Sequence, residues 1–85
     1  MKNNYQTVLN YLQKRVRVHF TGEVIIPPVI AVSEALKIPL EEVETIYQEL
    51  LERCVIRQFS DWEYVIAHEF PMTDQIRMKI GTVRY

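Results

Sequence analysis

The apolar residues of this sequence change their spacing once, near residue 55, and this change limits the possible fold more than any other feature. Before it, apolar residues recur every three or four positions, which is typical of amphipathic helices. After it, they alternate with polar residues, as they do in strands. Helices followed by strands within 85 residues predict one small α+β domain.

Three helices are expected before the change in spacing. The first spans about residues 3–19, and Thr21-Gly22 ends it because glycine adopts the left-handed conformation at little cost. The second spans about residues 29–37. The third spans about residues 40–53, and Pro39 is suited to its start.

The residues expected in the core are those of the apolar stripes on these helices. They are Tyr5, Val8, Leu9, Leu12, Val16 and Phe20 on the first, Val32, Ala35 and Leu36 on the second, and Val43, Ile46, Tyr47, Leu50, Leu51 and Cys54 on the third.

Two strands are expected over residues 55–59 and 63–67, joined as a hairpin through Ser60-Asp61-Trp62. Residues 23–26 form a short extended piece, because the residue before a proline is pushed out of the helical region. Residues 70–85 alternate weakly at Ile76, Met78 and Ile80, which predicts a C-terminal arm or an extra strand.

This order of elements is that of a winged helix-turn-helix domain, and residues 8–66 resemble the DNA-binding domain of GntR-type bacterial transcription regulators. The matching positions are Gly22-Glu23, Ile26-Pro27, the apolar residues Val32, Leu36, Ile38, Val43 and Leu50, and Val55-Ile56 at the start of the wing. The resemblance implies a winged helix over residues 1–69, with three helices and a two- or three-stranded antiparallel sheet.

The resemblance also implies DNA-linked transcription regulation, since the third helix of this family enters the major groove. The residues on the corresponding face of the third helix are Glu41, Glu42, Glu44, Thr45 and Gln48. Leu40 and Glu44 stand where the family tends to have arginine, and Arg57 lies on the expected wing.

Charge is unevenly distributed, although the net charge is only −1. Residues 1–21 hold four basic residues and no acidic one, whereas residues 34–53 hold six glutamates. Carboxylates on a groove-entering helix oppose binding to phosphates, which depends on cations. Contact with DNA or with an acidic partner is therefore expected from Lys14, Arg15, Arg17 and Arg57.

The alternative function is a winged helix that serves as a protein-docking or dimerisation module. Ile30 and Leu40 are apolar where the resemblance needs no core residue, and Trp62 lies at the tip of the hairpin. Exposed apolar patches rimmed by charge often mark protein contacts. These three residues are the expected contacts for a protein partner or a second copy of the chain.

Several other classes of protein are not expected. The single cysteine excludes an internal disulfide. No apolar run is long enough for a membrane span, and the first residues lack a secretory pattern. A cytoplasmic location is therefore expected. His19, His68 and Cys54 do not have the spacing of zinc ligands. Without a catalytic or nucleotide-binding motif, we expect no enzyme, no metal and no cofactor. The chain ends soon after the wing, so no small-molecule effector is expected.

Overall fold

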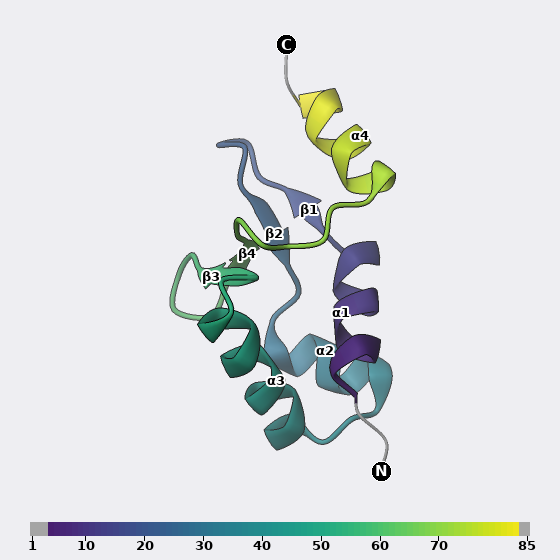
Figure 1. The fold of residues 1–85 in the computed structure, drawn as a ribbon, viewed down its shortest axis with the longest axis vertical. Coiled ribbons are helices and arrows are strands. Elements are labelled where there is room, and N and C mark those ends of the chain that lie inside the picture. Colours follow the sequence, from purple (N-terminus) through teal and green to yellow (C-terminus); the bar gives the residue numbers. More distant parts are fainter. Residues whose placement is uncertain (1–3, 84–85) are drawn as a thin grey trace.

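The computed structural model describes the backbone of residues 4–83 and the side chains of residues 4–78 (Figure 1). The expectations for residues 1–3, 84 and 85, and for the side chain of Ile80, lie outside this part. The described elements are α1 (Tyr5–Lys14), β1 (Arg17–Val18), β2 (Val24–Ile26), α2 (Val29–Leu36), α3 (Leu40–Glu52), β3 (Ile56–Gln58), β4 (Tyr64–Ile66) and α4 (Asp74–Val83).

The expected α+β class is confirmed, and the order from α1 to β4 is compatible with a small winged helix. The described residues contain four helices and a four-stranded antiparallel sheet, so the expected three helices and two or three strands were too few. The strand order is β1-β2-β4-β3, which places β2 and β4 at the centre. None of the described helices is both long and apolar enough to cross a membrane.

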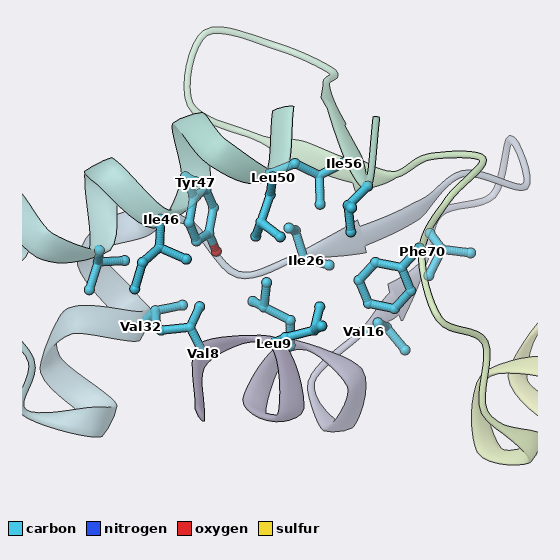
Figure 2. Close-up of a cluster of buried hydrophobic side chains, with 14 of the residues drawn as sticks. Val8, Leu9, Val16, Ile26, Val32, Ile46, Tyr47, Leu50, Ile56 and Phe70 are labelled. Carbon is cyan, nitrogen blue, oxygen red and sulfur yellow. The ribbon is translucent and has the colours of Figure 1, made fainter. Parts of the chain in front are cut away.

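The main core lies between α1, α3 and one face of the sheet. Figure 2 shows Leu50 of α3 and Ile56 of β3 facing Val8 and Leu9 of α1, with Ile26 of β2 between them. Four of the six residues expected on the stripe of the third helix are buried, namely Val43, Ile46, Tyr47 and Leu50. The expected register of α3 is therefore confirmed.

The expected end of the first helix was wrong. Helix α1 ends at Lys14, and Arg17 and Val18 form β1 instead. Residues 15–19 also alternate polar and apolar side chains, and Arg17 and Val18 pair with Ile25 and Val24 of β2, which provides partners for backbone groups outside the helix. Gly22, with a φ of 95°, turns the chain between the two strands, and Phe20 is 85% exposed rather than part of the apolar stripe.

Besides Phe20, two other expected core residues lie at the surface. Ala35 is exposed on α2. Of the three residues expected in the core from this short helix, Val32 is fully buried and Leu36 is partly buried. Cys54 is exposed because α3 ends at Glu52, so Cys54 follows the helix in the left-handed conformation with a φ of 61°. The amide of Val55 donates to the carbonyl of Leu50 and completes this helix end.

The C-terminal segment forms a helix and not the expected extra strand. The amide of Ile76 donates to the Thr73 hydroxyl at 3.3 Å, and Asp74 lies in the first turn, where a negative charge is favourable. Ile76 and Phe70 are buried in the main core, while Met78 is exposed. Helix α4 lies beside β1, at the opposite end of the molecule from α2 and α3 (Figure 1).

The sheet has a second apolar layer on the face that is turned away from α1 and α3. We call this the outer face, and its central row consists of Arg17, Ile25, Val65 and Arg57, paired in register across the four strands. Ile25 and Val65 are buried but do not belong to the main core.

Side-chain pairs between distant strands explain this burial. Arg17 lies 3.8 Å from the Glu63 carboxylate, and Arg57 lies 2.9 Å from that of Glu23. Glu63 directly precedes β4 and Glu23 directly precedes β2, and neither strand is a neighbour of the strand that carries the paired arginine. Both arginine side chains therefore extend across the sheet beside its central residues. The ring centroids of His19 and Phe59 are 5.7 Å apart, although these residues lie at opposite ends of the strand order. The outer face is therefore covered by its own long side chains.

Candidate binding grooves

One side of α3 borders a groove of about 490 Å³, which we call the acidic groove. Its rim carries four of the residues expected on the face of the third helix, namely Glu41, Glu44, Thr45 and Gln48. Their spacing of three and four positions places them on one side of the helix. The Thr45 hydroxyl donates to the Glu41 carbonyl at 3.0 Å, so its hydrogen is engaged within the helix. The two carboxylates are exposed.

The floor of the acidic groove is formed by Val29, Tyr47, Leu51 and Tyr64. The rings of Tyr47 and Tyr64 meet edge to face, with centroids 5.2 Å apart. The Tyr47 hydroxyl donates to the Pro27 carbonyl. Burial, with smaller effects from Tyr64 and Tyr11, raises the pKa of the Tyr47 phenol well above its ordinary value. The floor therefore remains uncharged beneath a negative rim.

Glu42 lies apart from the other residues expected on this face. It is half-buried, and its carboxylate accepts a hydrogen bond from the Asn4 amide at 2.6 Å. This contact joins the start of α3 to the start of α1. Glu42 does not line the acidic groove.

The four basic residues expected to contact DNA or an acidic partner are in two different situations. Arg17 and Arg57 are paired with carboxylates on the outer face of the sheet. Lys14 is exposed in the last turn of α1, and the Arg15 guanidinium lies 5.6 Å from the centroid of the Tyr11 ring. Within residues 4–78, neither Lys14 nor Arg15 has an ion-pair partner. Of these four residues, the two without a carboxylate partner among the described residues both lie at the end of α1.

A second groove, of about 330 Å³, lies on the other side of the strand ends, and we call it the basic groove. The residues that line it are Arg15, Arg17, Ile25, Ile26, Pro27, Pro28, Trp62 and Glu63. It therefore brings two of the expected cations together with Trp62, which was expected to contact a protein.

The three residues of the expected protein-contact patch are all exposed, by 60% at Ile30, 40% at Leu40 and 72% at Trp62. Trp62 lines the basic groove, whereas Ile30 and Leu40 line neither of the two grooves. The structure does not gather all three around a single groove.

The floor of the acidic groove contains residues that sequence reasoning did not assign to a site. Tyr64 comes from β4, and Leu51 was expected only in the core. The alternation of residues 63–67 predicted a strand, but it could not predict which segments lie beside that strand. For Val29 the sequence did contain a signal, because the Pro27-Pro28 pair places this residue at the start of α2 beside the end of β2.

The described residues contain no group of three or more histidine, cysteine, aspartate or glutamate side chains that could hold a metal ion. The two grooves differ in charge, with carboxylates beside the apolar residues of one and guanidinium groups beside those of the other. Comparison of the chain with protein-family models, curated protein sequences and solved structures found no match.

Proposed function

We propose that this chain is a protein-docking domain whose acidic groove receives a basic peptide segment of a partner protein. The observation that carries the proposal is the position of Glu41 and Glu44 above the apolar floor of that groove. A lysine or arginine side chain has an aliphatic stem and a charged end. Its stem would pack on Val29 and Tyr64, and its charged end would meet a carboxylate. We also propose a cytoplasmic location, where a single thiol stays reduced.

Electrostatics favour this partner over DNA at the same surface. The two carboxylates on the groove rim are exposed and have no cationic partner among the described residues, so they attract cations and repel phosphates. Two of the four candidate DNA-contacting cations, Arg17 and Arg57, are already paired with glutamates. Contact with DNA would require these pairs to be exchanged for phosphate contacts.

The test is a titration of a labelled short peptide, with alternating lysine and leucine, by fluorescence anisotropy. The double variant Glu41→Gln, Glu44→Gln should weaken binding by about tenfold, because it removes two charge pairs worth together about 1.4 kcal/mol. The matched control is Glu34→Gln, Glu69→Gln, which removes the same charge from exposed positions outside the groove. The control should retain most of the affinity. Equal losses in the two variants would mean that only the total charge of the domain matters, and would contradict the proposal.

DNA-linked regulation is the second candidate, and the order of elements from α1 to β4 favours it. Lys14 and Arg15 would then contact the phosphates. Duplex DNA in the same titration separates the two functions. If the unmodified chain binds the duplex more tightly than the basic peptide at the same salt concentration, docking of a basic partner is overturned and DNA-linked regulation is favoured.

A further inference from the structure

The basic groove lies on the opposite side of the sheet from the acidic groove. Glu63 lines the basic groove, whereas Tyr64, the first residue of β4, lines the acidic groove. Successive residues of an extended chain point to opposite faces of a sheet. Ile25 and Arg17, which are paired in the central row of the outer face, also line the basic groove. The basic groove is therefore a separate surface on the outer face.

Two guanidinium groups line the basic groove because Arg15 and Arg17 lie on the same side of the extended chain after α1, while Val16 between them is buried in the main core. Arg17 lies 3.8 Å from the Glu63 carboxylate, which is at the outer limit for an ion pair. Among the described side chains, no carboxylate pairs with Arg15, whose guanidinium lies over the Tyr11 ring. The groove thus has one guanidinium group available for an incoming anion.

Apolar side chains lie beside these guanidinium groups. Pro27, Pro28 and Trp62 line the same groove, and Trp62 is 72% exposed. Tryptophan and arginine are the residues that most often dominate the energy of protein contacts. The groove therefore matches a ligand that has an anionic group close to an apolar one.

The charge of the groove favours a peptide over a nucleic acid strand as this ligand. A strand brings one phosphate for each nucleotide, and Glu63 in the groove and the exposed Asp61 beside Trp62 repel phosphates. A single carboxylate requires only one guanidinium group, which binds it through two parallel hydrogen bonds. Arg15 can provide these hydrogen bonds without breaking an ion pair.

We infer that the basic groove is a second binding site, which takes a peptide segment that has one acidic residue close to a large apolar residue. The carboxylate meets Arg15, and the apolar side chain packs against Trp62 and Pro28. This site goes beyond the proposed function and does not depend on it. Because the two grooves lie on opposite faces of the sheet, both can be occupied at once, and the domain can then join two partners.

Trp62 provides a direct readout for the basic groove, since it is the single tryptophan of the chain. A side chain that covers it excludes water from the indole and shifts its emission to shorter wavelength. A peptide in the acidic groove, on the opposite face, leaves the emission unchanged.

The experiment compares two labelled peptides by fluorescence anisotropy. Both have two leucines among serines, and they differ only in one glutamate, which is glutamine in the second peptide. The glutamate peptide should bind about tenfold more tightly, because its carboxylate forms charged hydrogen bonds with Arg15. The unlabelled glutamate peptide should shift the emission of Trp62.

Variants of two adjacent cations make the test specific. Arg15→Gln should remove the preference for the glutamate peptide. Lys14→Gln removes the same charge from an exposed position outside the groove, so this variant should retain the preference. Equal midpoint temperatures of thermal unfolding check that both variants are folded. Arg15→Lys keeps the charge but loses the planar group, and it should bind with intermediate affinity.

The independence of the two grooves is tested by adding a saturating lysine-leucine peptide. The affinity for the glutamate peptide should not change. Competition between the two peptides would mean that they share one surface, and would overturn the inference. If the lysine-leucine peptide does not bind while the glutamate peptide does, the proposed function fails and the second site stands.

Three further outcomes would overturn the inference. Equal affinity for the glutamate and glutamine peptides would mean that Arg15 does not receive a carboxylate. Equal effects of Arg15→Gln and Lys14→Gln would show that only the total charge matters. Tighter binding of a single-stranded oligonucleotide, with the same shift of Trp62, would assign the basic groove to nucleic acid.

Discussion

The two faces of the sheet differ in what covers them. On the inner face, Ile26 and Ile56 pack into the main core against α1 and α3 (Figure 2). On the outer face, Ile25 and Val65 are buried to a similar extent, but side chains from other strands cover them. The apolar residues of the two sheet faces are thus buried to a similar extent, although helices cover one face and long side chains cover the other.

The difference shows how a chain of this size can protect a four-stranded sheet that has its main helices on one face. The aliphatic stem of arginine is long enough to lie over an apolar neighbour while its charged end reaches a carboxylate. Such a cover adapts its shape at low cost, since the side chains can change rotamer. A core packed between helices relaxes only in part after a substitution.

The largest expected effect comes from a matched pair of substitutions, one on each side of this comparison. Val43 and Val65 are both fully buried, but Val43 belongs to the main core and Val65 to the outer face. Val43→Ala should lower the free energy of unfolding by about 2 kcal/mol, because a cavity remains between the helices. Val65→Ala should lower it by about 1 kcal/mol, because the covering side chains close the space. Chemical denaturation measures both, and equal losses would show that the outer cover is as rigid as the core.

An effect of intermediate size is expected at Tyr47, whose hydroxyl donates to the Pro27 carbonyl on the inner side. Tyr47→Phe should lower the free energy of unfolding by about 1 kcal/mol near neutral pH, the usual worth of one hydrogen bond.

The same substitution should change how stability depends on pH. Burial raises the pKa of the Tyr47 phenol above its ordinary value of 10.0, so the folded state holds the proton more tightly than the unfolded chain. The contribution of this proton to stability is complete below pH 10 and is lost as the pH rises further. The midpoint temperature of thermal unfolding should therefore decrease less steeply above pH 10 for Tyr47→Phe than for the unmodified chain. If the two proteins show the same decrease, groups other than Tyr47 determine the stability at alkaline pH.

The smallest expected effect is that of the charge of an arginine on the outer face, measured apart from the effect of its aliphatic stem. Arg57→Ala removes both, and Arg57→Met removes the ion pair with Glu23 but retains a long aliphatic side chain. The pair is exposed, so its charge should contribute less than about 0.5 kcal/mol. We expect Arg57→Ala to lower the free energy of unfolding by about 1 kcal/mol and Arg57→Met by less than half as much. Equal losses would indicate that the charge, rather than the stem, protects Ile25 and Val65.

Much of the fold could be predicted from the spacing of apolar residues along the sequence alone. The register of α3 and the two strands of the hairpin followed from spacing, because the residues of each of these elements keep one period along its length. The end of α1 did not, because Val16 fits both a helical and an alternating pattern, and only pairing with β2 decides between them. The exposure of Cys54 could not be predicted without knowing where α3 ends, and that end depends on the backbone conformation after Glu52.

The candidate site was less accessible to sequence reasoning. Periodicity on α3 brought Glu41, Glu44, Thr45 and Gln48 together, and the structure keeps them on one rim. The floor requires Val29 and Tyr64 to meet α3, which depends on how β2 and β4 pair. The ion pairs of Arg17 and Arg57 join strands that are not neighbours in the sheet, so no local pattern predicts them.

The pairing of β2 with β4 also has a consequence for synthesis of the chain. These strands are neighbours at the centre of the sheet, yet α2, α3 and β3 lie between them in the sequence. The side of β2 that faces away from β1 therefore lacks its partner strand β4 until residue 66 has left the ribosome. Contacts between distant segments form late because a long loop must close first. A nascent chain or a proteolytic fragment that ends before β4 exposes a ribbon with an unpaired apolar edge, which is a substrate for chaperones and a site of aggregation.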